Sequence, residues 1–554
     1  MLARLLTLAA LAALAYIPAA GSTSLAAPSG VHAFMLRADE QYQDTFSRTP
    51  SFAWQPYEGA TRYDFQLATG TKFDERTIVW TTDSSKPLHA PAATVPLALP
   101  WMTGRPYALY ARVRAHTARG ITAWSKPFGF NTQWEALPEQ ITPDVPGLVR
   151  WTPVEGATSY EVWFVNADKL VATTTNVADE RDYYSASDGP KFGGEVLWRV
   201  RAVRKLYGGF PNALPAVSYG PWSPVFFSVA SPVTAGTVLA PSKTVSDVLT
   251  ENTGSIAHSL TPGFSFSGAV TGQGTLYRVY VATDRRCVNI VYVGAAVGSP
   301  AWAPRTGAVG DGAAPGTAAD GQKVVPTESL GSVGPQPIPP GSPSTSGAVN
   351  PTDSGPAVDL WDLGRTNARY WWTVVPVATG SSTPATGSST SGSATTTGSG
   401  TSALRDLGLP QDTCDGGWVM EFAKTSAPAT TALSSPYVSG LSRFGDLVTA
   451  STKVPSFYGA PVVAWEPARG ATEYEVQWSR TRTPWRTAGS AVTASTSTLL
   501  DQLTPGTWFY RVRGIDPYVT GPVKQMTWST SVKFTIARPR FLVQSGVTTR
   551  RVKK

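Results

Sequence analysis

Histidine, cysteine and paired carboxylates are the side chains that most often carry catalysis or hold metals, and this chain has few of them. Four histidines, His32, His89, His116 and His258, are spread over 554 residues. None stands at a ligand-like spacing from another histidine or from a cysteine. The sequence therefore predicts no metal, no cofactor and no catalytic residue.

Carboxylates do not form a recognisable catalytic pair either. Glu58 and Glu155 occupy the same place in two copies of a repeated turn, and Arg469 stands at that place in a third copy. Two carboxylates flanking a glycosidic bond would be needed for glycoside hydrolysis, and no such pair can be assigned. We therefore expect the chain not to be an enzyme.

Cys287 and Cys414 are the only cysteines. A chain that is exported could join them, because disulfides persist in oxidising compartments. Such a bond would close a loop of more than a hundred residues and add about 4 to 5 kcal/mol in the chain-entropy model. The expected fold could also place the two cysteines near opposite ends of a domain, so the sequence leaves the disulfide open. A Cα separation above about 7 Å would argue against it.

Arginine pairs that flank a valine recur three times and invite an interpretation as an anion-binding stripe. The pairs are Arg112 and Arg114, Arg199 and Arg201, and Arg511 and Arg513. If the valine faces inward, both arginines face solvent, where acidic residues of a neighbouring strand (Asp64, Glu161 and Glu475) are expected to face the same way. We therefore predict a ladder of cross-strand ion pairs, each contributing about 0.2 to 1 kcal/mol.

The residues that position these side chains belong to a repeat. The stretch from Trp151 to Tyr160 returns as Trp54 to Tyr63 and as Trp465 to Tyr474, with a weaker copy from Phe266 to Tyr277. A proline after each tryptophan ends a strand, and a glycine permits a positive φ in the turn that follows. Alternation of apolar and polar residues continues on both sides, so the repeat is predicted to be a strand, a turn and a strand.

The repeated aromatic residues and valines are predicted to form the cores of the domains. This structural repeat core comprises Trp54, Trp151, Trp465, Tyr63, Tyr160, Tyr277, Tyr474, Val113, Val200, Val512, Trp124, Trp222, Trp418 and Trp528.

The repeated unit resembles the fibronectin type III family as found in exported bacterial proteins. The resemblance is carried by a Trp before a Pro, a Gly-Ala turn, a Tyr-x-Val strand, an Arg-Val-Arg strand and a closing Trp-Ser. It covers the chain from about residue 36 to about residue 538. It implies an all-β fold of four tandem immunoglobulin-like (fibronectin type III-like) β-sandwiches, with low-complexity insertions in the divergent third.

The expected organisation follows from the spacing of the repeats. It is a signal peptide (1–26), domain 1 (36–134), domain 2 (140–230), domain 3 (236–427) with disordered insertions near 304–357 and 379–416, domain 4 (430–538) and a basic tail (539–554).

The N-terminus indicates export. Arg4 is followed by an apolar run from Leu5 to Ile17 that is too short to cross a bilayer, and small residues come next. The formal charge is +8, and Arg550, Arg551, Lys553 and Lys554 at the end of the chain supply four of these charges, so nucleic-acid binding is not expected. We predict a secreted protein, with or without association with the cell envelope, that does not span a membrane.

Function is less determined than architecture. We expect a non-enzymatic spacer, adhesion or protein-interaction module whose partner is an extracellular protein or a polysaccharide. The alternatives are a carbohydrate-binding surface protein and an accessory chain of a secreted hydrolase. Trp371 is the candidate ligand-contact aromatic, because its neighbour Trp372 is expected to face inward.

Overall fold

The computed structural model describes residues 25–36, 44–101, 109–134, 136–142, 145–173, 175–185, 189–206, 214, 217–230, 240–245, 257–259, 262–267, 275–294, 296–303, 305, 368–379, 404–424, 438–441, 447–449, 456–457, 459–468, 471, 473–515 and 528–538. β-Strands dominate these residues, and the one α-helix among them is α2 (Pro410–Asp415). The predicted signal peptide up to residue 24, most of both insertions and the basic tail lie outside the described residues.

Domain 1 consists of two sheets that face each other across a core. One sheet has the order β1-β3-β6, and the other has the order β2-β9-β7-β4-β5 with β8 paired to β7. Burial alternates along β7, where Leu109, Ala111 and Val113 point into the core. The elements are β1 (His32–Phe34), β2 (Thr45–Phe46), β3 (Ser51–Ala53), β4 (Ala60–Ala68), η1 (Glu75–Thr77), β5 (Ile78–Thr81), β6 (Ala92–Thr94), β7 (Leu109–Thr117), β8 (Gly120–Ile121) and β9 (Phe128–Thr132).

Domain 2 repeats this plan with a smaller first sheet. β10 pairs with β13, and the facing sheet has the order β12-β11-β16-β17 with β18 also paired to β16. The elements are β10 (Leu148–Arg150), β11 (Ser159–Phe164), β12 (Lys169–Thr173), β13 (Val177–Asp179), η2 (Arg181–Tyr183), β14 (Tyr184–Ser185), β15 (Gly189–Pro190), η3 (Phe192–Gly194), β16 (Glu195–Lys205), β17 (Val217–Tyr219) and β18 (Phe226–Val229).

Domain 3 pairs a sheet of order β19-β21-β24 with one of order β20-β27-β25-β22-β23, and β26 joins β25. The elements are β19 (Ala240–Val245), β20 (Ala257–Ser259), β21 (Gly263–Ser267), β22 (Thr275–Ala282), β23 (Ile290–Val293), β24 (Ala301–Trp302), β25 (Ala368–Thr379), β26 (Leu404–Asp406), α2 and β27 (Met420–Lys424).

Domain 4 has sheets of order β29-β28-β31-β34 and β30-β36-β35-β32-β33. The elements are β28 (Val438–Leu441), β29 (Leu447–Thr449), β30 (Ser456–Phe457), β31 (Val462–Ala464), β32 (Glu473–Ser479), β33 (Thr487–Thr493), β34 (Ser497–Leu499), β35 (Gly506–Ile515) and β36 (Val532–Ile536). The predicted fold class, all-β with four immunoglobulin-like sandwiches, is confirmed by this arrangement of paired sheets.

Two details differ from the sequence-based organisation. The first strand, β1, begins at residue 32 and so precedes the expected start of domain 1 at residue 36. Residues 404–416, expected inside a disordered insertion, instead form β26 and α2. Pairing of β26 with β25 supplies the backbone hydrogen bonds that a disordered segment would have made with water.

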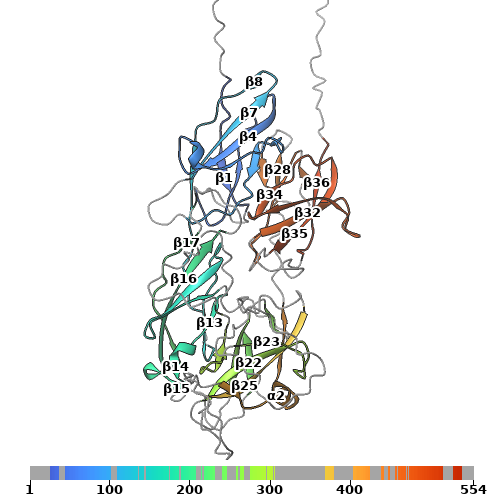
Figure 1. Cartoon of the computed structure of the whole chain (residues 1–554). Helices are drawn as coiled ribbons and strands as arrows, with labels where there is room; N and C mark the ends of the chain where they lie inside the picture. The colour runs from blue at the N-terminus through green and yellow to red at the C-terminus, as the bar shows by residue number, and fades with distance from the viewer. Residues whose placement is uncertain are drawn as a thin grey trace, which may run out of the picture.

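The chain turns back on itself, so that its first and last domains lie side by side. In Figure 1 it descends from β1, β4 and β7 through β16 to β22 and β25, and then returns to β32 and β35 beside domain 1. Direct hydrogen bonds join the two end domains, from Ser51 to Ser497 (2.8 Å) and from the Leu499 amide to Thr94 Oγ1 (3.0 Å). Within the described residues, no helix has the length and apolar character needed to cross a membrane.

Candidate functional site: the sheet faces and the domain junctions

The repeated turn is stabilised by its tryptophan and its tyrosine, whose rings are in contact and whose tyrosine hydroxyl binds the backbone of the turn. In domain 2, the Trp151 and Tyr160 rings meet edge to face with centroids 5.4 Å apart, and the Tyr160 hydroxyl accepts the Val154 amide at 2.8 Å. In domain 1, Tyr63 accepts the Tyr57 amide in the same way. The nine-residue spacing therefore lets the tyrosine hydroxyl reach back to the turn that the tryptophan opens.

Most of the predicted core residues lie between the sheets. The buried ones are Trp54, Trp151, Trp465, Tyr63, Tyr160, Tyr277, Tyr474, Val113, Val200 and Val512. The closing tryptophans are different, and their assignment to the core is wrong: Trp124, Trp222 and Trp528 are half-buried, and Trp418 is 39% exposed.

For Trp124, Trp222 and Trp528 the reason is the serine that follows each of them, whereas Trp418 is followed by Val419. Ser125 is buried, and its hydroxyl accepts the Val113 amide at 3.1 Å. Ser223 and Ser529 bind the amides of Val200 and Val512 in the same way, at 3.0 and 2.9 Å. Because neighbouring residues of an extended chain point in opposite directions, an inward serine turns its tryptophan outward.

Each outward tryptophan meets the arginine pair of its own domain. In domain 1, the guanidinium carbons of Arg112 and Arg114 both lie 4.5 Å from the Trp124 ring centre. Trp222 has Arg199 at 4.9 Å and Arg201 at 4.7 Å. Trp528 has Arg511 at 4.1 Å and Arg513 at 4.3 Å. In these cation–π contacts the guanidinium groups cover the tryptophan ring, so the ring and the arginines are engaged with each other.

The predicted ion-pair ladder is confirmed. Its carboxylates pair with the second arginine of each motif: Arg114 with Asp64 at 2.7 Å, Arg201 with Glu161 at 2.6 Å, and Arg513 with Glu475 at 2.5 Å. The first arginines of domains 1 and 4 bind Gln66 and Gln477 instead. Burial would raise the pKa of Asp64, but hydrogen bonds and charges from His116 and Arg114 hold it below its usual value. These arginines therefore bind residues of their own sheet.

Domain 3 has an ion pair on the corresponding sheet, but with a different partner strand. Arg278, which lies opposite Val375, is 3% exposed and reaches Asp406 on β26 at 2.6 Å. The Tyr280 hydroxyl donates to the same carboxylate, and burial raises the pKa of both Asp406 and Tyr280. The partner of Arg278 thus comes from residues that the sequence analysis assigned to an insertion.

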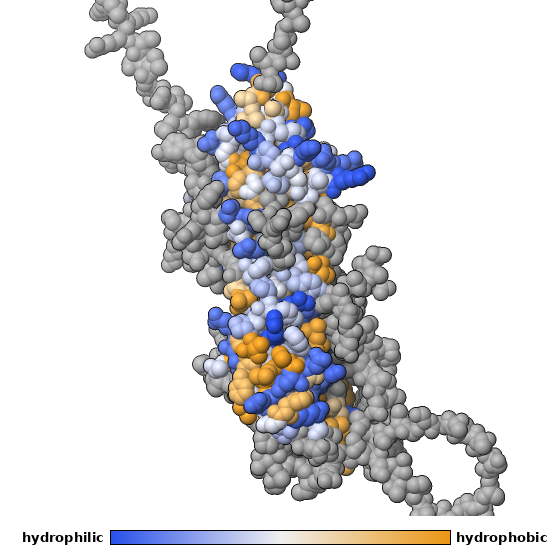
Figure 2. Space-filling model, turned by 90° about the vertical axis from the view of Figure 1, so that its left-hand side faces the viewer, coloured by the Kyte–Doolittle hydropathy of each residue, from blue (hydrophilic) through white to orange (hydrophobic). Residues whose placement is uncertain are grey.

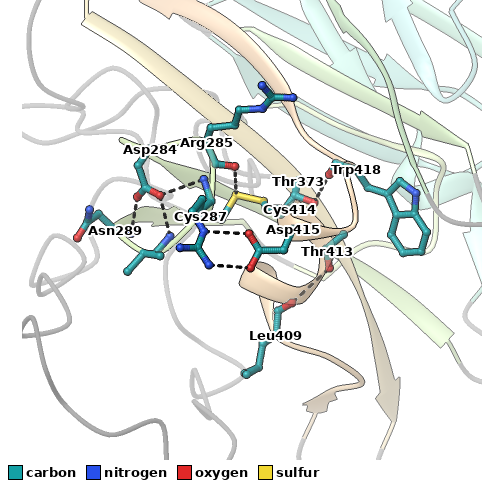
Figure 3. Close-up of a disulfide and its surroundings, with 12 residues drawn as sticks. Asp284, Arg285, Cys287, Asn289, Thr373, Leu409, Thr413, Cys414, Asp415 and Trp418 are labelled. Carbon is teal, nitrogen blue, oxygen red and sulfur yellow. Dashed lines mark hydrogen bonds and ion pairs between the residues drawn. A yellow bond between two sulfur atoms is a disulfide. The ribbon is translucent and has the colours of Figure 1, made fainter.

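A disulfide joins Cys287 to Cys414, with their Cα atoms 6.0 Å apart (Figure 3). It ties α2 to the turn that precedes β23, and an exposed ion pair from Arg286 to Asp415 (3.1 Å) lies beside it. In Figure 3 the Trp418 ring points away from the disulfide, on the far side of the Thr373 hydrogen bond to the Trp418 carbonyl. The predicted contact aromatic, Trp371, is half-buried beside the fully buried Trp372.

Arg48 forms the first of two domain junctions. Its side chain is 5% exposed, and Nη1 donates to the Trp465 carbonyl and to Thr496 Oγ1, both at 3.1 Å. It also pairs with Glu466 of domain 4 at 3.2 Å and with Glu155 of domain 2. One arginine of domain 1 therefore holds the repeated turns of two other domains.

Arg204 of domain 2 completes this junction. Its guanidinium donates to the Leu99 carbonyl of domain 1 and, at 2.8 Å, to the Gly156 carbonyl in its own turn. Burial lowers the pKa of Arg204 to about 10, so the side chain is still charged at neutral pH. Trp101 of domain 1 packs into the core of domain 2, which removes the contact from water.

Asp179 forms the second junction, between domains 2 and 3. Its side chain is fully buried and pairs with Arg181 at 2.6 Å and with Arg305 of domain 3 at 2.8 Å. It also accepts the Ala303 amide at 2.8 Å. Burial by itself would raise the pKa of Asp179, but the two arginines and the amide lower it to about 2.

No cofactor or metal arrangement emerges from this geometry. In the described part of the chain, no group of three or more His, Cys, Asp or Glu residues could hold a metal ion. His116 contacts Asp64 at 2.8 Å, and His89 contacts Asp501 of domain 4 at 2.8 Å. Arg48, Arg204 and Asp179 carry no signal in the sequence, because none belongs to the repeat and their partners in other domains lie far away along the chain.

No family model matches the chain, and no curated protein does. Among solved structures, the chicken CNTN1 FN1-FN3 domains are 16% identical with a TM-score of 0.15, over 46% of this chain and 80% of that chain. The chicken interferon gamma receptor alpha chain is 10% identical with a TM-score of 0.18, over 37% of this chain and 98% of that chain. At the level of the fold, the four domains are immunoglobulin-like β-sandwiches.

Proposed function

We propose that this chain is an exported, non-enzymatic interaction protein whose four sandwiches form one preassembled scaffold for an extracellular partner. The supporting observation is the Arg48 junction, in which one buried side chain of domain 1 binds domain 2 and domain 4 together. A simple extended spacer would leave the turns of domains 2 and 4 in solvent. Using them to fix domain 1 gives the scaffold a defined shape.

The arrangement of charges supports a scaffold rather than an anion-binding surface. The arginine pairs of domains 1, 2 and 4 are each engaged by a tryptophan, and their second members also by a carboxylate. Because breaking these contacts would cost a partner part of its binding energy, the paired arginines are poorly placed to attract anions. Recognition is then expected to depend on the shape formed by several domains.

The test compares the whole chain with a variant in which domain 4 is released. Residues 25–554, wild type or Arg48→Ala, are immobilised and exposed to envelope fractions, extracellular proteins and a glycan panel, while small-angle scattering reports the domain arrangement. The exposed Arg76→Ala is the matched control. We expect a partner that binds wild type and control equally and the expanded Arg48→Ala variant at least about tenfold more weakly. Equal binding by an expanded variant, or no binding to any fraction, would contradict the scaffold proposal.

Polysaccharide binding is the second candidate, and Trp418 favours it. This ring is 39% exposed and extends from the disulfide-bonded end of domain 3. Exposed indole rings can stack on sugar faces, whereas Trp124, Trp222 and Trp528 are already covered by guanidinium groups. A glycan that binds wild type and loses binding in Trp418→Ala, but not in Trp485→Ala, would favour this candidate over a protein partner.

A further inference from the structure

Among the described residues, no strand pairs with the outer edge of the last strand of domain 2, whereas a strand covers this edge in the other three domains. In domains 1, 3 and 4, a short strand of the same domain pairs in parallel with the last strand: β2 with β9, β20 with β27, and β30 with β36. In the part of domain 2 that the structure describes, β18 pairs only with β16.

The length of the connecting segment explains why the described residues of domain 2 include no such covering strand. Its first segment lies beside β10, since the Ile141 amide donates to the Arg150 carbonyl and the Thr152 amide to the Glu139 carbonyl. Residues 142–147 are all that connect this segment to β10. In domain 1, by contrast, residues 35–50 separate β1 from β3 and include β2. The shorter connection can reverse direction but cannot also reach the other sheet and return.

The backbone of β18 presents alternate residues to this edge. The Ala230 amide donates to the Gly194 carbonyl, toward β16, whereas the Phe227 carbonyl faces the other way and accepts the Gln140 side-chain amide at 3.0 Å. In an antiparallel pair, the amide and carbonyl of one residue point to the same side, and alternate residues share that side. Val225, Phe227 and Val229 therefore direct their backbone groups to the free edge.

The same three residues carry exposed apolar side chains. Val225 is 53%, Phe227 52% and Val229 59% exposed. Figure 2 faces the side on which domain 2 lies in Figure 1, and it shows apolar side chains gathered in the lower half of this face among hydrophilic ones. We call Val225, Phe227 and Val229 the β18 edge.

The other domains place different residues at these positions. The strand register aligns Phe227 with Gly129, Glu421 and Lys533, and Val229 with Asn131, Ala423 and Thr535. Charged or small residues on a strand discourage edge-to-edge pairing. Domain 2 thus combines an uncovered edge with the residues that favour strand addition.

We propose that the β18 edge pairs antiparallel with the β18 edge of a second copy of this chain, across a two-fold axis at Phe227. The sequence of the edge reads the same in both directions, valine, phenylalanine, valine. Phe227 would therefore face Phe227 of the partner subunit, and Val225 would face Val229 of the partner subunit.

This pairing satisfies both the backbone and the side chains. Three outward residues on each strand give about six hydrogen bonds, and the amide of the half-buried Gln140 side chain gives up the Phe227 carbonyl. Aromatic and β-branched cross-strand pairs are the favourable ones. A self-complementary patch is what a two-fold interface requires. The inference goes beyond the proposed function, because it concerns self-association and holds whatever the extracellular partner is.

The test is sedimentation velocity of the full chain from about 1 to 200 µM, a range suited to a small interface. Wild type should shift from monomer to dimer. Phe227→Lys should weaken the dimer at least about tenfold, because it places two like charges opposite each other. The matched control is Val492→Lys, at a residue that is 58% exposed on β33 of domain 4, and it should dimerise as wild type does.

Cross-linking checks the position of the axis. The chain has no free cysteine among the described residues, so Phe227→Cys gives a single reactive site there. A short bismaleimide should join two Phe227→Cys chains and leave Val492→Cys chains largely unjoined. A monomer throughout the concentration range, or a dimer that Phe227→Lys leaves unchanged, overturns the proposal. Capture of an unrelated extended peptide at β18 by a chain that stays monomeric also overturns it, and assigns the edge to a foreign strand.

Discussion

Each of the two domain junctions is held by a buried charged side chain, and the two charges have opposite signs. At the first, a buried cation, Arg48, is surrounded by carboxylates that are about one quarter exposed, Glu155 at 24% and Glu466 at 25%. At the second, a fully buried anion, Asp179, is held by arginines that are only 17% and 11% exposed. The Asp179 junction is drier, so its charges depend more strongly on each other. It should therefore be the harder of the two to break.

The largest effect is expected from Asp179→Ala. The change removes the buried carboxylate that pairs with Arg181 and leaves Arg305 with Asp182, and it should lower the free energy of unfolding by about 3 to 5 kcal/mol. Chemical denaturation with a domain 2 tryptophan signal measures it. The exposed Asp74→Ala is the control and should change stability by less than about 0.5 kcal/mol. A loss below about 1 kcal/mol for Asp179→Ala would mean that water replaces the carboxylate easily.

A smaller effect is expected from Arg48→Ala. Glu155 and Glu466 keep partial contact with water, so the loss should be about 2 to 3 kcal/mol, below that of Asp179→Ala. Domain 4 should also move away from domain 1, which small-angle scattering detects as a larger radius of gyration. If Arg48→Ala destabilises the chain more than Asp179→Ala does, the proposed ranking of the junctions is wrong.

Acid should weaken the Asp179 junction selectively. The pKa of Asp179 is about 2 in the folded chain, below the usual 3.8, so the unfolded chain binds the proton more tightly. The stability from this carboxylate, about 2 kcal/mol, is complete above about pH 5 and is lost as the pH falls toward 2. Denaturation midpoints of wild type and Asp179→Asn should converge over this range. Parallel pH profiles would show that Asp179 does not titrate as its surroundings imply.

The smallest effect uses two glycines at the same place in the repeated turn. A Cβ on Gly156 would lie 2.7 Å from the Ser47 carbonyl oxygen of domain 1, whereas one on Gly59 meets nothing within 4 Å. Both have positive φ, 78° and 74°, so backbone strain is shared. Gly156→Ala should therefore cost about 1 to 2 kcal/mol more than Gly59→Ala in denaturant titrations. Equal losses of unfolding free energy in the two variants would show that the Arg48 junction accommodates a methyl group at Gly156 without cost.

The repeat predicted the sandwiches well because its information is local. Alternating burial around Trp54, Trp151 and Trp465 sets the strands, and the Asp64 and Arg114 pair follows from strand parity once the expected fold places their strands side by side. Trp124, Trp222 and Trp528 were misplaced because their direction depends on the inward hydrogen bond of the next serine. That bond joins the closing segment to a backbone amide of a strand lying beside it.

The sequence by itself determined four sandwiches, the buried aromatic residues and valines of the repeated turn and strand, and the ion-pair ladder, since these depend on residues within one repeat. Only the tertiary structure decided that Cys287 meets Cys414, that Asp406 serves Arg278, and that Arg48 and Asp179 join domains. Each of these contacts links residues more than a hundred positions apart. No local periodicity encodes such a pairing: the fold of domain 3 brings together Cys287 with Cys414 and Arg278 with Asp406, and the shapes and charges of neighbouring domains select the contacts of Arg48 and Asp179.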